Sequence, residues 1–267
     1  MENSGSIPKI GFGCWSIGGG MSANPALEGK SLHALRSALE LGYTHFDTAE
    51  AYAGGYCEEL LGRAIGETGK NREALFITTK VSPEHLAPEL IRKSCEASLR
   101  RLGMDYIDLY LIHWPRIGMK LEDAFQALNA LVRSGKVRHL GVSNFNLKLL
   151  KQARSHSESG VFTDQVPYSL NDRRYANNGV LEYCQTNDIL LTAYSPLDQG
   201  SFEPSKKIRD IAQAHGATPE QVALCWLIAQ PKVITIPMSF NLQHQQENLA
   251  AADIELSPAE IAQLNDL

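Results

Sequence analysis

Short apolar runs alternate along the chain with longer stretches in which apolar residues recur every three or four positions. Short runs rich in β-branched and aromatic residues are typical of buried strands, and the longer period is typical of helices with one buried face. The expected strands are 10–14, 43–46, 75–79, 107–112, 137–142, 162–166, 189–194 and 233–236. The expected helices are 30–41, 58–65, 88–102, 121–132, 147–153, 180–185, 206–214, 219–228, one after Asn241 and one after Ser257.

This alternation of strands and helices predicts an α/β fold with a parallel sheet. A length of 267 residues suits a single (β/α)₈ TIM barrel, for which about 250 residues are typical. We find no repeat, linker or low-complexity stretch, so we expect one domain over residues 1–267. A doubly wound open sheet shows the same alternation. The length and the polar residues at the strand ends favour the barrel.

Helix ends are marked by local signals at three places. Thr218 with Gln221, and Ser257 with Glu260, have the spacing of a capping box, with a proline at the first helical position. Gly103 follows the helix expected at 88–102, and glycine commonly ends a helix by adopting a left-handed conformation. These signals predict two helix starts and one helix stop.

Composition narrows the possible functions. The net charge is −5 with no basic block, which argues against a nucleic acid partner. Five cysteines without a CxxC pair and eight histidines without an HExxH pair argue against a disulfide framework and a metal site. There is no signal-peptide pattern, and the most apolar stretch, 222–229, is far shorter than the roughly 20 residues that span a bilayer. We expect a soluble cytoplasmic protein that binds no membrane.

Four residues at the expected strand ends carry the candidate chemistry. Asp47, Lys80 and His113 each lie at or just beyond the end of an apolar run, and Tyr52 follows Asp47 in the next loop. The C-terminal strand ends of a barrel form the face on which catalytic side chains gather. A free tyrosine, with a pKa of about 10, is a poor proton donor or acceptor at neutral pH. A neighbouring ammonium group favours the phenolate and lowers that pKa.

Each of these residues also has a purely structural explanation. Lys80 and Asp47 could form a partly buried ion pair that closes the barrel. His113 could be a core histidine with its hydrogen bonds satisfied, and Tyr52 could be a surface ring. The occurrence of all four at strand ends favours the catalytic interpretation.

Several further segments occur in a specific order. They are Gly-Phe-Gly-Cys-Trp at 11–15, Asp-Thr-Ala-Glu-Ala-Tyr at 47–52, Thr-Thr-Lys at 78–80, Leu-Ile-His-Trp-Pro at 111–115, Gly-Val-Ser-Asn-Phe at 141–145, Gln165, and Tyr-Ser-Pro-Leu at 194–197. Over nearly its whole length the chain therefore resembles the aldo-keto reductases. The resemblance implies a barrel enzyme that interconverts carbonyls and alcohols with a nicotinamide cofactor.

Physical reasoning and the resemblance assign the same roles to the four strand-end residues, which we call the tetrad. Tyr52 is expected to be the general acid–base and Lys80 the group that tunes its pKa. Asp47 is expected to be the partner of Lys80. His113 would orient the carbonyl and stabilise the developing oxyanion.

The resemblance also implies a nicotinamide pocket. Asn144 and Gln165 would bond the carboxamide, next to Ser143. Tyr194 would stack on the ring, and the loop that follows it would complete the pocket with Ser195, Pro196 and Leu197. A Rossmann fingerprint is missing, because no GxGxxG follows a strand. The segment at 29–31 is not a phosphate loop, because Asn24 stands where its first glycine should be.

The adenosine end departs from the usual family pattern. The resemblance assigns it Met238, Ser239, His244, Glu247 and Asn248. Many family members have lysine at the position of Met238 and arginine at the position of His244. A phosphomonoester carries about −1.5 to −2 charges at pH 7, and arginine is its strongest partner. We therefore expect NADP(H) or NAD(H) as cofactor, without a strict preference for NADP(H).

The substrate side is expected to be open. Trp15 and Trp114 flank the tetrad and are expected to wall the substrate, whereas Trp226 is expected in the core. The sequence ends at Leu267, soon after the terminal helix, and the loop at 114–120 is short. From these features we expect loose substrate choice.

The resulting hypothesis is a nicotinamide-dependent oxidoreductase that acts on small carbonyl compounds, as a monomer or a weak homo-oligomer. One alternative is a non-catalytic nucleotide-binding module of the same fold, as in the channel-associated members of the family. A barrel hydrolase or lyase would need a metal cluster or a pair of carboxylates at the strand ends, and neither is found in the sequence.

Overall fold

Eight parallel strands form one sheet whose order follows the chain, in a computed structural model that describes residues 7–267. The strands are β1 (Phe12–Gly13), β2 (His45–Asp47), β3 (Phe76–Val81), β4 (Ile107–Ile112), β5 (Val137–Ser143), β6 (Thr163–Pro167), β7 (Leu190–Tyr194) and β8 (Val233–Thr235). The sheet closes because Ile10 bridges Thr235, with the Gly11 amide donating to the Thr235 carbonyl at 2.8 Å. The closed sheet is the expected (β/α)₈ barrel.

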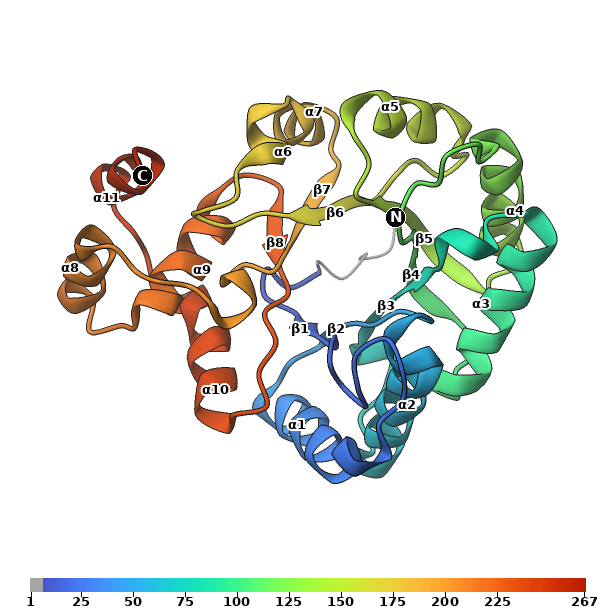
Figure 1. Ribbon diagram of the computed structural model, residues 1–267, viewed down its shortest axis with the longest axis horizontal. Coiled ribbons are helices and arrows are strands. Elements are labelled where there is room, and N and C mark those ends of the chain that lie inside the picture. Colours follow the sequence, from blue (N-terminus) through green and yellow to red (C-terminus); the bar gives the residue numbers. More distant parts are fainter. Residues whose placement is uncertain (1–6) are drawn as a thin grey trace.

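Helices surround the strands on the outside of the barrel (Figure 1). They are α1 (Glu28–Leu41), α2 (Tyr56–Thr68), α3 (Pro88–Leu102), α4 (Leu121–Arg133), α5 (Leu147–His156), α6 (Arg174–Asn177), α7 (Val180–Thr186), α8 (Lys206–Ala214), α9 (Pro219–Ala229), α10 (Leu242–Ala250) and α11 (Pro258–Asn265). Among residues 7–267, none of these helices has the length and apolar character to cross a membrane.

The expected elements are confirmed, with shifted bounds and one omission. The strand expected at 10–14 is reduced to two residues, and the one expected at 43–46 begins only at His45. The second shift arises because the Tyr43 amide still donates to the Ala38 carbonyl and closes the end of α1. Strand β3 continues beyond residue 79, so Lys80 lies inside it. Helix α6 was not predicted, because its four residues are too few to show a helical period.

The local helix signals act as expected. Thr218 and Ser257 both form complete capping boxes, with Gln221 and Glu260 as their respective partners. Gly103 ends α3 with a φ of 65°. These helix ends depend on hydrogen bonds between residues close in sequence, so the sequence predicts them well.

Glycines at the start of the barrel allow β1 to lie close to the elements on both sides of it. A Cβ atom at Gly11 would lie 2.4 Å from the His45 Nδ1 atom, and one at Gly13 would lie 2.5 Å from the Ile236 carbonyl oxygen. A larger residue at either position would push β1 away from its neighbours. Gly13 is therefore required where β1 meets the segment after β8 at the closure of the barrel, and Gly11 where β1 passes the His45 ring.

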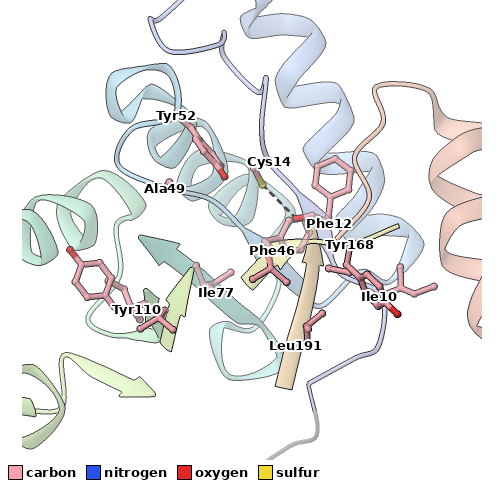
Figure 2. Close-up of a cluster of buried hydrophobic side chains, with 14 of the residues drawn as sticks. Ile10, Phe12, Cys14, Phe46, Ala49, Tyr52, Ile77, Tyr110, Tyr168 and Leu191 are labelled. Atoms are coloured by element: carbon pink, nitrogen blue, oxygen red, sulfur yellow. Dashed lines mark hydrogen bonds between the residues drawn. The ribbon is translucent and has the colours of Figure 1, made fainter. Parts of the chain in front are cut away.

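The apolar core lies between the sheet and the helices, and part of it is shown in Figure 2. Phe12, Phe46, Ile77 and Leu191 are buried there. Burying a side chain of this size stabilises a fold by about 1.5–3 kcal/mol. Trp226, with 1% of its surface exposed, belongs to the core as expected.

The interior of the barrel is filled by side chains in layers. Phe76, His139 and Phe162 stack at the N-terminal end of the strands, with ring centroids 4.7 to 6.3 Å apart. Above them the His45 ring bonds the Thr78 hydroxyl at 3.1 Å. Since side chains alternate along a strand, residues two positions further on form the next layer, at the C-terminal end. The candidate site lies there.

Candidate active site

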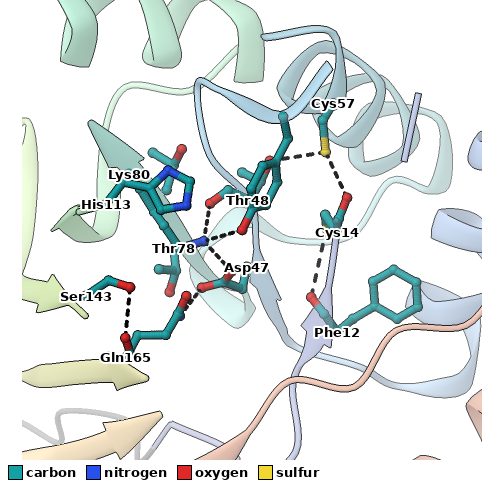
Figure 3. A network of polar contacts seen from close by, with 12 residues as sticks. Phe12, Cys14, Asp47, Thr48, Cys57, Thr78, Lys80, His113, Ser143 and Gln165 are labelled. Carbon is teal, nitrogen blue, oxygen red and sulfur yellow. Dashed lines mark hydrogen bonds and ion pairs between the residues drawn. The ribbon is translucent and has the colours of Figure 1, made fainter. Parts of the chain in front are cut away.

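The centre of the site is a buried lysine with three hydrogen-bond acceptors. Lys80 Nζ donates to Asp47 Oδ1 at 2.5 Å, to the Thr48 carbonyl at 2.8 Å and to the Tyr52 hydroxyl at 3.2 Å (Figure 3). In the register of β2 with β3, Asp47 lies opposite Thr78. Lys80 follows two residues later on the same face. Adjacent parallel strands thus bring the carboxylate and the ammonium group together, and the loop after β2 adds the phenol.

The Asp47–Lys80 pair keeps the lysine charged. Burial alone would lower the pKa of Lys80, but Asp47 and Tyr52 more than offset this, so its pKa lies above the ordinary value. The Lys80 side chain is fully buried. Removing one partner from such a pair leaves an unpaired charge in the interior, which is strongly destabilising. A permanent positive charge therefore lies beside the Tyr52 hydroxyl.

The pKa of Tyr52 differs from the expectation. Burial raises it to about 12, and the Lys80 charge, which acts in the opposite direction, offsets only part of this effect. Lys80 lowers the pKa of Tyr52 as expected, but desolvation of the phenolate was not foreseen and outweighs the attraction of the ammonium group, so the net shift is upward. At neutral pH the phenol is protonated and can donate.

Tyr52 is not a surface ring. It is 9% exposed and packs edge-on against Trp15 and His113, with ring centroids 5.0 and 5.6 Å away. It opens a short turn in which Ala53 has a φ of 52° and Gly54 a φ of 63°. This backbone conformation directs the chain away from β2 and places the ring above the end of the barrel.

His113 is a neutral group beside the phenol. It follows β4, and its amide donates to the Val81 carbonyl at 3.0 Å. Burial, assisted by the Lys80 charge, lowers its pKa to about 3. A neutral imidazole carries one N–H donor, so His113 can polarise a carbonyl without carrying a positive charge.

The four residues expected at the nicotinamide end form one hydrogen-bonded group. Ser143 Oγ donates to the Gln165 carbonyl at 2.8 Å, Asn144 Nδ2 donates to Ser143 Oγ at 2.9 Å, and the Tyr194 hydroxyl donates to Asn144 Oδ1 at 2.8 Å. Asn144 has a φ of 63°, a conformation that asparagine tolerates better than most residues. The group comes from β5, β6 and β7, which are neighbours in the sheet.

One contact joins this group to the tetrad. Gln165 Nε2 donates to Asp47 Oδ2 at 2.7 Å across the barrel. Gln165 was predicted only as a cofactor residue, and this second contact was not predicted. The bond depends on the height of each residue along its strand, which the sequence alone does not show.

A cavity of about 870 Å³ opens over the C-terminal ends of the strands. It has the size of a small-molecule site. Most of the expected site residues line it: Trp15, Asp47, Tyr52, His113, Trp114, Ser143, Asn144, Gln165, Tyr194, Ser195, Pro196, Leu197, Met238, Ser239 and His244. Three expected residues do not line it: Lys80, Glu247 and Asn248. Lys80 lies buried behind Tyr52, while Glu247 and Asn248 belong to α10.

Further lining residues were missed by the sequence analysis. Met21, Glu84, Gln199 and Phe240 lie in four different loops, where no periodic pattern marks them. A second hollow of about 860 Å³, between the loop after β4 and α5, contains none of the tetrad. We take the cavity over the strand ends as the site, because it alone of the two holds the tetrad.

The residues present fit a nicotinamide group. Gln165 uses its Nε2 atom for Asp47, so its Oε1 atom is free to accept a hydrogen bond from a carboxamide. Asn144 and Ser143 supply further polar atoms, and the Tyr194 ring offers a flat apolar face. Such a small set of polar atoms in an otherwise apolar cavity is typical of a cofactor site.

The adenosine end fits a phosphate less well. Met238, Ser239, Phe240 and His244 line the cavity there. Ser239 Oγ already accepts a hydrogen bond from the Asn241 amide at 3.0 Å. Lys30 Nζ lies 4.4 Å from the centre of the Phe240 ring, so one cation approaches this end from α1.

Comparison with known proteins agrees with this geometry. The model of the Aldo/keto reductase family matches residues 9–267. Methylglyoxal reductase YeaE of Escherichia coli is 36% identical over 266 residues, which cover 97% of this chain and 90% of that protein. Glyoxal reductase of Bacillus subtilis is 35% identical over 267 residues, which cover 100% of this chain and 91% of that protein.

Solved structures show the same fold. A thermostable aldo-keto reductase in complex with the inhibitor epalrestat superposes with a TM-score of 0.94 at 42% identity, over 98% of this chain and 96% of that one. An aldo/keto reductase from Klebsiella pneumoniae in complex with NADP and acetate has a TM-score of 0.88 at 36% identity, over 97% of this chain and 91% of that one. With its barrel, its buried Asp47–Lys80–Tyr52 contacts and these relatives, the chain belongs to the aldo-keto reductase family.

Proposed function

We propose that the chain reduces small aldehydes and ketones to alcohols, with NADPH or NADH as hydride donor and Tyr52 as proton donor. The observation that carries this proposal is the chain of contacts from Asp47 through Lys80 Nζ to the Tyr52 hydroxyl, at the wall of the cavity. A charged lysine fixed by a carboxylate is suited to stabilise the phenolate that a proton-donating tyrosine leaves behind.

When bound, the reduced nicotinamide supplies the hydride that attacks the carbonyl carbon. Ser143, Asn144 and Gln165, which line the cavity, would hold its carboxamide, and Tyr194 would pack against its ring. At the nicotinamide pocket the protein would contribute orientation. Holding two reactants in the right geometry can lower the activation free energy substantially.

The tetrad acts on the carbonyl oxygen. The neutral His113 donates a hydrogen bond to that oxygen and holds it near Tyr52. As the hydride arrives, the Tyr52 proton moves to the oxygen, the alcohol forms, and the negative charge passes to the phenolate beside Lys80. Water then returns a proton to Tyr52. Because burial raises the pKa of Tyr52 to about 12, the donor is protonated throughout the neutral range.

The substrate class follows from the relatives and from the walls of the site. Two relatives are named methylglyoxal and glyoxal reductases. Trp15 and Trp114 are 41% and 47% exposed, so flat apolar surfaces border a cavity that is open to solvent. We infer small aldehydes and vicinal dicarbonyls as substrates. We also infer a cytoplasmic location, since the five cysteines are buried free thiols.

The test is turnover with a panel of carbonyl compounds. Purified protein is mixed with NADPH or NADH and with methylglyoxal, glyoxal, benzaldehyde or a ketose, and loss of the reduced cofactor is followed by absorbance. We expect turnover of at least one small aldehyde and loss of that turnover in Tyr52→Phe. Cofactor binding without turnover of any compound would instead support the non-catalytic module.

A further inference from the structure

Charge is distributed unevenly around the cavity. The loops after β2, β3 and β4 carry Tyr52, Glu84 and His113, and these strands are neighbours in the sheet. The residues expected to hold the cofactor come from β5, β6 and β7 and from the loops after β5, β7 and β8. The substrate side of the cavity is therefore the side that includes Glu84. This assignment rests on the function proposed above.

No lysine or arginine lines this cavity in the described part of the chain. Lys80 lies behind Tyr52, and its charge is balanced by Asp47 at 2.5 Å. His113 is neutral, since burial and the Lys80 charge lower its pKa to about 3. A carboxylate on a substrate would thus find no cationic side chain on the wall to pair with.

Glu84 adds a negative charge to the wall. It is exposed, lies in the short turn Pro83–His85, and forms no ion pair within the described residues. Its neighbour Glu50 fixes the turn, because Glu50 Oε1 accepts from the Ser82 amide at 2.6 Å and contacts His85 Nδ1 at 3.0 Å. The turn is held in place by Glu50, so Glu84 is positioned in the wall of the cavity.

The charged groups near the cavity do not neutralise the negative charge of Glu84. Arg116, two residues after Trp114, lines the separate hollow next to α5. His85 is engaged by Glu50, and Arg174 pairs with Asp172 at 2.7 Å. The unpaired carboxylate is thus the permanent charge on the substrate side of the cavity wall among the described residues.

We propose that Glu84 makes this enzyme select uncharged carbonyl substrates over anionic ones. The favoured class is neutral aldehydes and dicarbonyls, and the disfavoured class is 2-oxo acids, sugar acids and aldehydes that carry a carboxylate. For two unit charges about 8 Å apart, with an effective dielectric constant between about 20 and 80, the repulsion corresponds to about a 2- to 30-fold discrimination. Salt should weaken the discrimination, because the carboxylate is exposed.

The experiment compares two aldehydes of equal shape. 4-Formylbenzamide is neutral and 4-formylbenzoate is anionic, and each is reduced with saturating NADPH at low and at high salt. The measured quantity is the ratio of kcat/KM for the amide to kcat/KM for the carboxylate. We expect a ratio of about 2 to 30 for the natural enzyme, a smaller ratio for Glu84→Gln, and a still smaller one for Glu84→Lys.

Glu73→Gln is the matched control. Glu73 is also exposed, but it precedes β3 and so lies at the opposite end of the barrel. The substitution Glu73→Gln changes the net charge by the same amount as Glu84→Gln, but it should leave the ratio of the two kcat/KM values unchanged. A ratio near one in the natural enzyme would overturn the proposal. So would a Glu84→Gln ratio equal to that of Glu73→Gln.

The charge preference can be tested even without turnover. Absence of reduction of these two aldehydes and of every compound in the panel above would contradict the proposed function. The two product alcohols, 4-(hydroxymethyl)benzamide and 4-(hydroxymethyl)benzoate, are then titrated into the protein with NADPH, and their dissociation constants are compared. Tighter binding of the amide, reduced by Glu84→Gln, would support the charge selection. Equal binding of both alcohols would overturn it.

Discussion

Gln165 donates a hydrogen bond from its Nε2 atom to Asp47 Oδ2 at 2.7 Å, although 118 positions separate the two residues in the sequence. Asp47 in turn accepts from Lys80, which contacts Tyr52. One glutamine therefore joins the proposed nicotinamide pocket to the proposed proton donor. A substitution at Gln165 should therefore affect both cofactor binding and proton donation by Tyr52. A cofactor that binds to the Gln165 amide should also influence the Asp47–Lys80–Tyr52 contacts.

Gln165→Leu tests this connection. The substitution leaves Asp47 Oδ2 buried without its donor, which should destabilise the fold by about 1–3 kcal/mol and lower kcat as well as cofactor affinity. Urea unfolding and steady-state kinetics measure the two effects. Thr192→Val is the control, because it breaks a buried Thr163–Thr192 hydrogen bond of 2.8 Å away from the tetrad and should lower stability but not kcat. An unchanged kcat in Gln165→Leu would contradict the connection.

Tyr52→Phe removes only the hydroxyl that is proposed to donate the proton. General acid–base groups typically contribute about 10²–10⁴-fold, so kcat should fall by that factor while the dissociation constant of NADPH changes little. Tyr110→Phe is the matched control. The Tyr110 hydroxyl is buried with no hydrogen-bond partner in the described chain, and its loss should leave kcat unchanged. Reduction at the natural rate by Tyr52→Phe would refute the assignment of the tetrad.

Lys80→Met should raise the pKa of Tyr52 further above about 12, because Lys80 lowers that pKa in the natural protein. Alcohol oxidation needs the phenolate, so its rate should rise with pH in both proteins and be lower in the variant at each pH. The alkaline limb of the profile should therefore move to higher pH. The exposed Lys93 provides the control Lys93→Met. A profile of unchanged shape and height in Lys80→Met would mean that Lys80 has only a structural role.

Two buried histidines should make the fold less stable in acid. Burial lowers the pKa of His45 to about 4 and that of His113 to about 3, from 6.5 in the unfolded chain. Below pH 6.5 the unfolded chain binds protons that the folded chain does not, so stability falls as the pH drops towards 4. The slope per histidine is at most about 1.4 kcal/mol per pH unit.

Urea unfolding at pH 7 and pH 5 measures this loss. His45→Gln should be less stable than the natural protein at pH 7 but should lose less on acidification. His33→Gln, at an exposed position on α1, should keep the natural pH dependence. Equal losses in all three proteins would show that other groups dominate the acid response.

Cofactor preference should be weak in the natural protein, since Met238 and His244 place no permanent cation on the cavity wall. Met238→Lys combined with His244→Arg should raise the affinity for NADPH over NADH at least tenfold, because a hydrogen bond to a charged group is worth about 1.5–3 kcal/mol. Fluorescence quenching gives both dissociation constants. A natural preference for NADPH above about a hundredfold would contradict the assignment.

Should such a preference be found, Lys30 is the residue to change first. Its Nζ atom lies over the Phe240 ring, next to the proposed phosphate position. Lys206, Lys207 and Arg209 lie on α8 and bond to Asp210, Gln263 and Pro204 instead. Lys30→Met should weaken NADPH but not NADH, whereas Lys206→Met should affect neither.

Much of the fold could be predicted from the sequence, because its signals are local. Strand β4 and helix α3 have the bounds that the apolar pattern predicted, and the capping boxes at Thr218 and Ser257 formed as expected. The gathering of Asp47, Tyr52, Lys80 and His113 was also predictable, since each lies near the C-terminal end of a strand or in the loop after it, and parallel strands in a barrel end on one face. That the chain is a single domain stays a prediction.

Other properties were decided only by the tertiary structure, because they depend on depth and register. The sequence shows that Tyr52 has a lysine partner, but the net sign of its pKa shift depends on how completely packing excludes water from the phenol. The pattern marks Gln165 as a strand residue, but its bond to Asp47 requires both side chains to lie at one height across a closed barrel. Glu84 belongs to a loop whose sequence shows no helical or strand period, and only the folding of that loop around Glu50 places Glu84 in the cavity wall. Local hydrogen bonds and periodicity can be derived from neighbouring residues, whereas burial and contacts across the barrel exist only once all eight strands have paired.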